Sequence, residues 1–475
     1  MKALLISPPT NSIVKAIIGT TGPPLGLAYL ASVAREEGWE VKIVDALAED
    51  LDFEDVEKII GKYYPDVLGL SATTSMIPDA YKVASIAKAI NPDMLVMIGG
   101  PHVTFTAEQT LEECQSIDVV VRGEGEETFR ELLQHLREGR GFRDILGITY
   151  RENGGEIRSN PPRPLIRDLD KVPLPAYDLL PMMKYRIGKI RFGTIMTSRG
   201  CPYNCVFCSS SLQFGKRWRS HSLDRVIEEL RILVERYRVR EIEFLDDTFT
   251  LNRKRAIEIS NTIRKEKLDI SWSASSRVNT FNREIGEAMR RAGAHTIYFG
   301  IESGSEKTLK FIGKGITLRQ SIDAVRAAKG AGLRTLGSFI IGFPYEELDD
   351  MKATIRFSNR VGVDLAQFTV ATPYPGTRLW EIAVKDNLLL TRDWGKFTTV
   401  DVVMRNLYLT AEQIQKLFFW AYLYFYLHPK HALQDLIKNK GFILKKTIPA
   451  VLKFIRENLG ILKRSWRKHS RRLSC

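Results

Sequence analysis

The chain alternates short β-branched segments with helical patterns in two long series, and this alternation limits its fold more than any other feature. In residues 1–140, helical patterns such as 24–37 and 77–90 separate the apolar segments. Such alternation implies a parallel sheet covered by helices, with ligands bound at the carboxyl ends of the strands. We therefore predict a doubly wound, Rossmann-like α/β domain with strands at 3–7, 40–44, 67–71, 94–98 and 118–121.

The second series begins near residue 191 and contains six strand–helix units. Its expected strands are 192–197, 241–245, 270–274, 296–301, 335–341 and 365–371. Six units are too few to close an eight-stranded barrel, so residues 191–409 predict a partial (β/α)6 barrel. Residues 141–190 are predicted to be a linker, because six prolines lie from Pro161 to Pro181 and Asn153-Gly154-Gly155 indicates a hairpin turn. Residues 410–475 predict a helical C-terminal region.

Three of the five cysteines, Cys201, Cys205 and Cys208, lie within eight residues, directly after the first strand of the second series. This is metal-ligand spacing and not a disulfide framework. A [4Fe–4S] cluster usually takes four thiolates, so three leave one iron open to another ligand. A zinc site with His221 as fourth ligand is the alternative, and the spacing and barrel context favour iron–sulfur.

The CxxxCxxC motif at this place resembles the radical S-adenosylmethionine superfamily. The resemblance implies that the open iron binds S-adenosylmethionine and that one electron then cleaves it to a 5′-deoxyadenosyl radical. It also implies contacts to S-adenosylmethionine from an aromatic residue inside the motif and from the ends of later strands. Those positions are Phe207, Asp246, Asp247, Glu302, Ser303 and Ser338. Read without the resemblance, the Asp246-Asp247 pair could equally be a helix N-cap.

A doubly wound domain before such a barrel resembles the cobalamin-binding radical enzymes, over roughly residues 1–410. The resemblance implies that strand-end loops face the lower side of the corrin. The residues in those loops are Ser71, Thr73, Thr74, Gly99, Gly100, Pro101, Gly123, Glu124 and Gly125. No histidine stands in an Asp-x-His-x-x-Gly motif, so we expect cobalamin without a protein histidine ligand, and a structural role for His102. FMN is the alternative ligand, because doubly wound domains bind both.

The charge of +14 is concentrated at the end of the chain. Residues 438–475 hold twelve Lys or Arg and one acid, which gives +11 and leaves +3 for the rest. Apolar residues recur at helical spacing among these cations, and this favours an anionic membrane surface over nucleic acid. The chain shows no export signal and no apolar run long enough to span a bilayer. We therefore expect a cytoplasmic protein, peripheral on the inner face of the membrane.

The resemblance implies an enzyme that methylates an unactivated carbon, and the expected membrane location favours a lipid, isoprenoid or tetrapyrrole-like substrate. The resemblance implies three cofactors: a [4Fe–4S] cluster, S-adenosylmethionine and cobalamin. An external one-electron reductant such as flavodoxin or ferredoxin is the expected partner. Oxidative cyclisation of a tetrapyrrole, as in the anaerobic Mg-protoporphyrin ester cyclases, is the alternative reaction. A cobalamin-responsive sensor without turnover is the alternative of another class, although sensing does not need an open iron.

Overall fold

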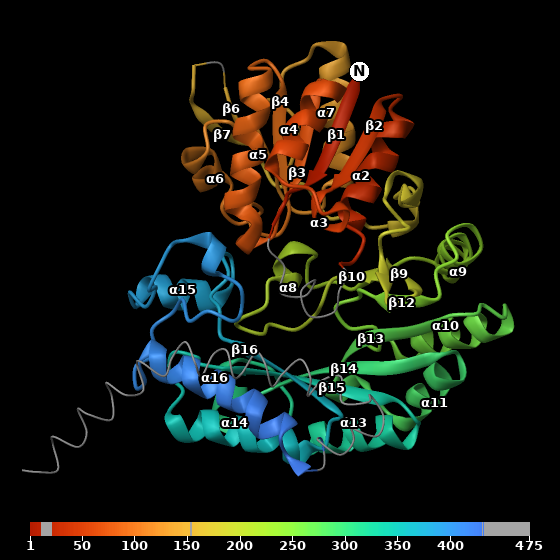
Figure 1. Ribbon diagram of the computed structural model, residues 1–475, viewed down its shortest axis with the longest axis vertical. Coiled ribbons are helices and arrows are strands. Elements are labelled where there is room, and N and C mark those ends of the chain that lie inside the picture. Colours follow the sequence, from red (N-terminus) through yellow and green to blue (C-terminus); the bar gives the residue numbers. More distant parts are fainter. Residues whose placement is uncertain (11–20, 153, 430, 432–475) are drawn as a thin grey trace, which may run out of the picture.

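Two seven-stranded sheets, one above the other, organise the chain (Figure 1). The computed structural model describes residues 1–10, 21–152, 154–429 and 431. The parallel strands of the N-terminal sheet point their carboxyl ends toward the C-terminal sheet. Helix α8 (Ser210–Gln213) and the loops around it lie between the two sheets. The α/β class and the two-part architecture predicted from the sequence are confirmed.

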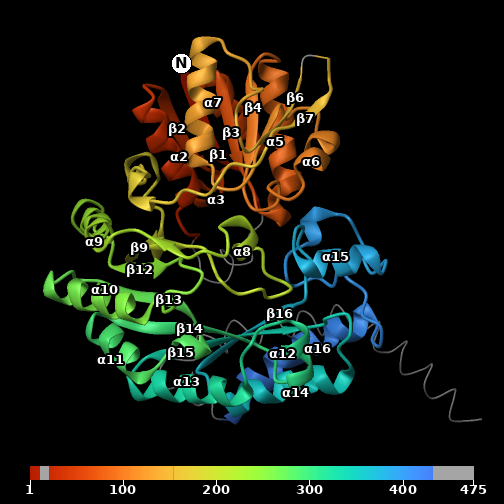
Figure 2. The ribbon, with the colours of Figure 1, turned by 180° about the vertical axis from the view of Figure 1, so that it is seen from behind.

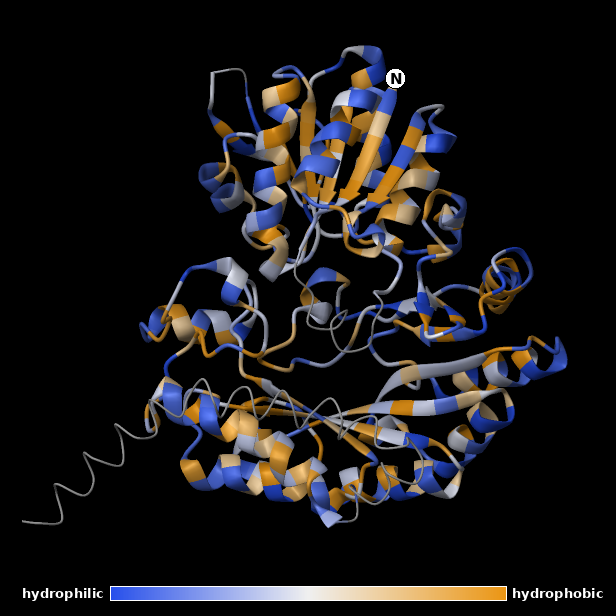
Figure 3. Ribbon diagram, viewed as in Figure 1, coloured by the Kyte–Doolittle hydropathy of each residue, from blue (hydrophilic) through white to orange (hydrophobic). Residues whose placement is uncertain are grey.

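The first sheet contains five parallel strands in the order β2-β1-β3-β4-β5. Most residues of its strands are apolar (Figure 3), and Leu4, Leu5 and Ile6 of β1, an inner strand, are fully buried. The strands are β1 (Lys2–Ser7), β2 (Glu40–Asp45), β3 (Val67–Ser71), β4 (Leu95–Gly99) and β5 (Val119–Val121). The helices are α2 (Leu25–Glu36), α3 (Ala46–Glu49), α4 (Phe53–Tyr63), α5 (Ile77–Ile90), α6 (Ala107–Glu113) and α7 (Glu126–Glu138). The order reverses between β1 and β3, where doubly wound sheets bind their ligands.

Part of the predicted linker extends this first sheet. Strands β6 (Ile148–Arg151) and β7 (Ile157–Ser159) pair antiparallel with each other, and β6 pairs antiparallel with β5. The hairpin expected around Gly154 and Gly155 is therefore present. From residue 160 to residue 185, the described helical structure is limited to two 3-10 turns, at Leu169–Lys171 and Tyr177–Leu179, as the prolines required.

The second sheet has the order β16-β15-β14-β13-β12-β9-β8, in which only β8 is antiparallel. Its strands are β8 (Arg186–Ile187), β9 (Ile190–Ile195), β12 (Glu241–Phe244), β13 (Ser271–Arg277), β14 (Ala294–Glu302), β15 (Arg334–Ile341) and β16 (Leu365–Val370). Helices α9 (Leu223–Arg231), α10 (Arg253–Lys265), α11 (Arg283–Arg291), α12 (Glu306–Phe311), α13 (Leu318–Gly330) and α14 (Leu348–Val361) follow its strands (Figure 2). Strands β9 and β16 do not pair, so the barrel is open, as predicted.

Helix α16 (Ala411–Tyr426) packs across the β16 edge of the open barrel. It begins at a capping box on Thr410, and it buries Ile414, Phe418 and Phe425. The Tyr422 hydroxyl donates to the Phe368 carbonyl of β16 at 2.9 Å. Helix α15 (Arg378–Lys385) precedes it. Within the described residues no helix has the length and apolarity needed to cross a membrane. The basic segment 438–475 lies outside the described residues.

Candidate active site between the two sheets

A cavity of about 250 Å³ opens where the strand order of the first sheet reverses. Its walls come from β1, α2, β3 and β4 and, on the opposite side, from Met196, Arg199 and Phe214 of the second domain. We call this space the switch-point cavity. Most of its lining is apolar, so it suits a flat, weakly polar group bound between the domains.

Two glycines in the wall of the switch-point cavity lie close to neighbouring segments. A Cβ on Gly69 would lie 2.6 Å from the Leu5 side chain, and one on Gly100 would lie 2.5 Å from the Ala72 carbonyl oxygen. Gly100 also has a φ of +120°, a conformation that side chains rarely adopt. At Gly100 the chain therefore approaches its own backbone too closely for a larger residue, whereas a side chain at Gly69 would require Leu5 to move.

The strand-end residues predicted for the first domain divide between two spaces. Seven of them line the switch-point cavity: Ser71, Gly99, Gly100, Pro101, Gly123, Glu124 and Gly125. Thr73 and Thr74, together with Pro101, line a second cavity of about 330 Å³ that we call the hydroxyl-lined cavity. Nδ1 of the buried His102 lies 3.3 Å from the Thr74 hydroxyl, and its ring packs edge-on against Trp394 at 4.6 Å. Burial lowers the pKa of His102 to about 4, so the imidazole is neutral.

Glu124 belongs to a buried ion cluster that joins the two domains. Its carboxylate accepts hydrogen bonds from Arg199 at 3.1 Å and Arg219 at 2.9 Å, and Arg199 also binds Glu126 at 2.5 Å. We call these four residues the interdomain ion cluster. Burial alone would raise the pKa of Glu126, but the Arg199 charge and hydrogen bond bring it below the ordinary value. Glu126 is therefore ionised, and the two glutamates together hold Arg199, two residues before Cys201, against the first domain.

The cysteine loop is fixed by its backbone. The Val206 N–H donates to the Ile312 carbonyl at 3.0 Å, and the Val206 carbonyl accepts from the Leu379 N–H at 2.8 Å. Gly200 has a φ of +92°, and a Cβ there would meet the Arg217 carbonyl oxygen at 2.5 Å. Because of these constraints, the loop keeps its place at the carboxyl end of the barrel sheet.

The three thiols fit a cluster by their chemistry. Cys201, Cys205 and Cys208 are free and half-buried, and they lie on this one loop. Burial raises the pKa of the Cys201 and Cys208 thiols. Metal binding must displace these protons. Within the described residues no three His, Cys, Asp or Glu side chains already stand at metal-binding distances. His221, the fourth ligand of the zinc alternative, instead pairs with Asp170 at 3.1 Å.

The neighbours Asp246 and Asp247, at the end of β12, have different surroundings. Asp246 accepts from the Thr197 N–H at 3.1 Å, from the Thr197 hydroxyl at 2.8 Å and from the Ser198 hydroxyl. Oδ2 of Asp247 is buried and has no hydrogen-bond partner in the described part of the chain. Burial raises the pKa of both carboxyls. Helix α10 is capped by Asn252, so neither aspartate is the helix cap that their sequence also allowed.

Glu302 ends β14 with a φ of +66° and forms a buried ion pair with Lys314 at 2.7 Å. A Cβ on Gly300 would lie 2.5 Å from a Glu302 carboxylate oxygen and 2.7 Å from Lys314 Nζ. Gly300 therefore makes the room for this pair. Strained backbone at a strand end is a frequent feature of ligand sites.

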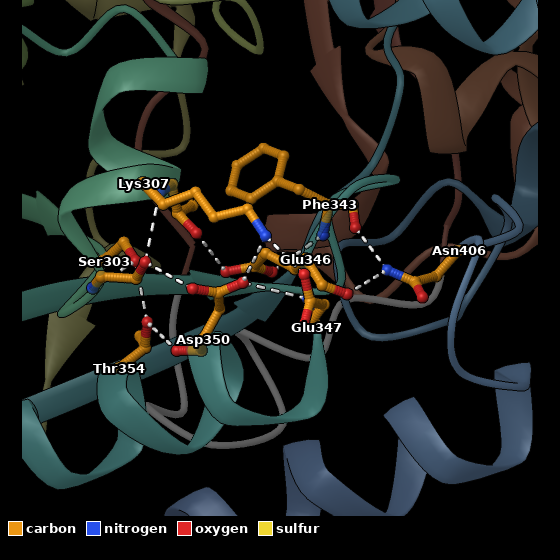
Figure 4. A network of polar contacts seen from close by, with 10 residues as sticks. Ser303, Lys307, Phe343, Glu346, Glu347, Asp350, Thr354 and Asn406 are labelled. Carbon is orange, nitrogen blue, oxygen red and sulfur yellow. Dashed lines mark hydrogen bonds and ion pairs between the residues drawn. The ribbon is translucent and has the colours of Figure 1, made fainter.

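Phe207 and Ser303 lie against the barrel body. The Phe207 ring is 6.1 Å from that of Phe343, which follows β15. The buried Ser303 hydroxyl bonds Thr354 of α14 at 2.8 Å, within a network that also holds Glu346 and Asp350 (Figure 4). Ser338 lies on β15 in register with Gly300 of β14.

Sequence reasoning missed several residues that the structure brings to the site. They are Tyr29, Glu126, Arg199, Tyr203, Phe214, Arg219, Arg277 and Lys314. Arg277 had a usable signal, since it is the last residue of a parallel strand. No sequence pattern indicated the interdomain ion cluster, because its paired residues are 73 to 95 positions apart in the chain.

Comparisons with known proteins agree with this geometry. Residues 11–133 match the family model described as B12 binding domain, and residues 195–358 match the Radical SAM superfamily. An uncharacterized methyltransferase of Pyrococcus horikoshii is 61% identical over 95% of this chain and 98% of its own length. The chain belongs to the cobalamin-binding radical S-adenosylmethionine family. Membership makes it an enzyme whose cofactors are a [4Fe–4S] cluster, S-adenosylmethionine and cobalamin.

Other members of this family catalyse different reactions. The anaerobic magnesium-protoporphyrin IX monomethyl ester cyclase of Rubrivivax gelatinosus is 31% identical over 85% of this chain and 74% of its own length. The hopanoid C-3 methylase of Methylococcus capsulatus is 27% identical over 80% of this chain and 72% of its own length. Among solved structures, OxsB with aqua-cobalamin and S-adenosylmethionine bound matches with a TM-score of 0.75 at 19% identity, over 99% of this chain and 75% of that one. That likeness shows a shared fold.

Proposed function

We propose that this enzyme methylates an unactivated carbon of a hydrophobic substrate of the lipid, isoprenoid or tetrapyrrole class. The observation that carries the proposal is the uncharged lining of the hydroxyl-lined cavity, which touches both cofactor modules. Thr73, Thr74 and Ser75 come from the first domain, Ser209 directly follows the last cysteine, and Tyr374 follows β16. No charged side chain of the described residues lines this cavity, so a charged substrate would lose hydration there without gaining an ion pair.

The surroundings assign the chain's own residues to the cofactors. Cys201, Cys205 and Cys208 would hold the cluster, and the unpartnered Asp247 oxygen would accept from the amino group of S-adenosylmethionine. The switch-point cavity would take the apolar part of cobalamin. When bound, the cofactors supply radical formation and a methyl carrier. The protein orients them and excludes water, and the interdomain ion cluster keeps the two modules together.

Oxidative cyclisation is the second candidate, supported by the 31% identity with the Rubrivivax cyclase. Product mass separates the two reactions, because methylation adds one methyl group to the substrate whereas cyclisation removes hydrogen. The uncharged lining suits a substrate with little charge in either reaction, so the cavity does not distinguish the two candidates.

Variants of Ser75 test the substrate class. The reconstituted full chain would be incubated with S-adenosylmethionine, cobalamin, a reductant and a panel of isoprenoid, hopanoid, porphyrin and polar phosphonate substrates. We expect Ser75→Asp to lose modification of the hydrophobic substrates, and Ser75→Ala to keep it. Both variants should still cleave S-adenosylmethionine. Turnover of the polar substrates alone by the unmodified enzyme would contradict the proposed class.

A further inference from the structure

Arg277 ends strand β13 and reaches the cysteine loop from across the barrel. Its Nη1 lies 3.6 Å from Cys205 Sγ, and its guanidinium carbon lies 3.5 Å from the centre of the Tyr203 ring. The residue is 5% exposed, so water screens its charge little. Its guanidinium therefore contacts a cysteine of the motif directly.

The Arg277 guanidinium is held in place from several sides. Nε donates to the Asn279 side chain at 3.3 Å, and Nη2 donates to the Lys314 carbonyl. Lys314 in turn pairs with Glu302 through its ammonium group. Among the described residues, Arg277 has no carboxylate partner. The Glu302 carboxylate pairs with Lys314 and therefore does not neutralise Arg277. A fixed, unneutralised cation therefore faces the Cys205 sulfur.

We propose that Arg277 is a positioning residue that sets the reduction potential of the cluster by donating to the Cys205 thiolate. The proposal rests on the proposed ligation of the cluster by the three cysteines. Reduction adds negative charge to the cluster, and hydrogen bonds to its sulfurs and nearby positive charge favour the reduced form. Removing the Arg277 charge should therefore move the potential to more negative values. Tyr203 contributes by holding the guanidinium plane.

The test is a potentiometric titration of the reconstituted full chain, followed by electron paramagnetic resonance. Iron and sulfide content are measured on every sample. We expect Arg277→Gln to lower the reduced-to-oxidised ratio at a fixed solution potential at least about tenfold, which is 59 mV for one electron. Arg277→Lys keeps the charge and should remain closer to the unmodified enzyme. Arg283→Gln, which removes an exposed guanidinium paired with Glu287, is the matched control and should cause no shift.

The outcomes separate this inference from the proposed function. If the unmodified chain assembles no [4Fe–4S] cluster, the ligation itself is wrong. If the cluster assembles and Arg277→Gln has an unchanged potential, the role of Arg277 is overturned while ligation stands. If Arg277→Gln loses its cluster, Tyr203→Leu decides, because it keeps the charge but frees the guanidinium. We expect a smaller negative shift in that variant, and an unchanged potential there would overturn the inference.

Discussion

Replacing Glu124 by Gln should destabilise the protein strongly, because it leaves a buried charge without compensation. The interdomain ion cluster contains two carboxylates and two guanidinium groups, so it is neutral as a whole. The Glu124, Arg199 and Arg219 side chains are 3%, 4% and 6% exposed. Gln cannot balance the two arginines, and one positive charge stays buried. Breaking a buried ion pair in this way costs about 3–5 kcal/mol.

The assay is urea unfolding of the full chain, followed by tryptophan fluorescence. Glu287→Gln is the matched control, because the Glu287 ion pair with Arg283 is largely exposed and should contribute about 0–1 kcal/mol. The reasoning would be refuted if Glu124→Gln lost no more stability than this control. That result would mean that Arg199 and Arg219 find other partners or water once the carboxylate is gone.

Three further predictions concern the cluster, pH and the basic tail. Alanine at Cys201, Cys205 or Cys208 should abolish cluster-dependent cleavage of S-adenosylmethionine, whereas Cys114→Ala should not, and full cleavage by any of the first three would sink the ligand assignment. Burial raises the pKa of Glu229 from 4.5 to about 7, so the folded state binds more protons between these values and stability falls as pH rises through them. In Glu229→Gln, the free energy of unfolding measured with urea should fall less between pH 5 and 8 than in the unmodified chain. An equal fall in both proteins would contradict this. Removal of residues 436–475 should abolish salt-sensitive cosedimentation with anionic vesicles. Equal binding by the full and the shortened chain would remove the case for a membrane surface.

The sequence predicted the strands and the cysteine loop well, because both depend on local patterns. Runs of apolar residues such as Leu4–Ile6 are visible in the sequence, as is the spacing of the three cysteines. Strand-end loops were also predictable, since parallel strands place their carboxyl ends at one edge. The same rule, applied to the end of β13, would have included Arg277.

Features that depend on tertiary contacts were not predictable. Asp246 and Asp247 are adjacent in sequence, yet only the structure shows that Thr197 and Ser198 occupy the first and leave an oxygen of the second without a partner. Glu124 was predicted as a cofactor contact from its loop, and the structure adds the two arginines that it binds. Ion pairs between distant segments leave no periodicity in the sequence, so no local pattern could have indicated them.

Product analysis of S-adenosylmethionine cleavage tests the central claim most directly. The full chain, reconstituted with iron, sulfide and cobalamin, would be incubated with S-adenosylmethionine and a strong one-electron reductant, and the products identified by mass. We expect 5′-deoxyadenosine from the unmodified chain and none from Cys205→Ala. Absence of 5′-deoxyadenosine from a chain that holds a full cluster, or equal formation by the variant, would contradict the account.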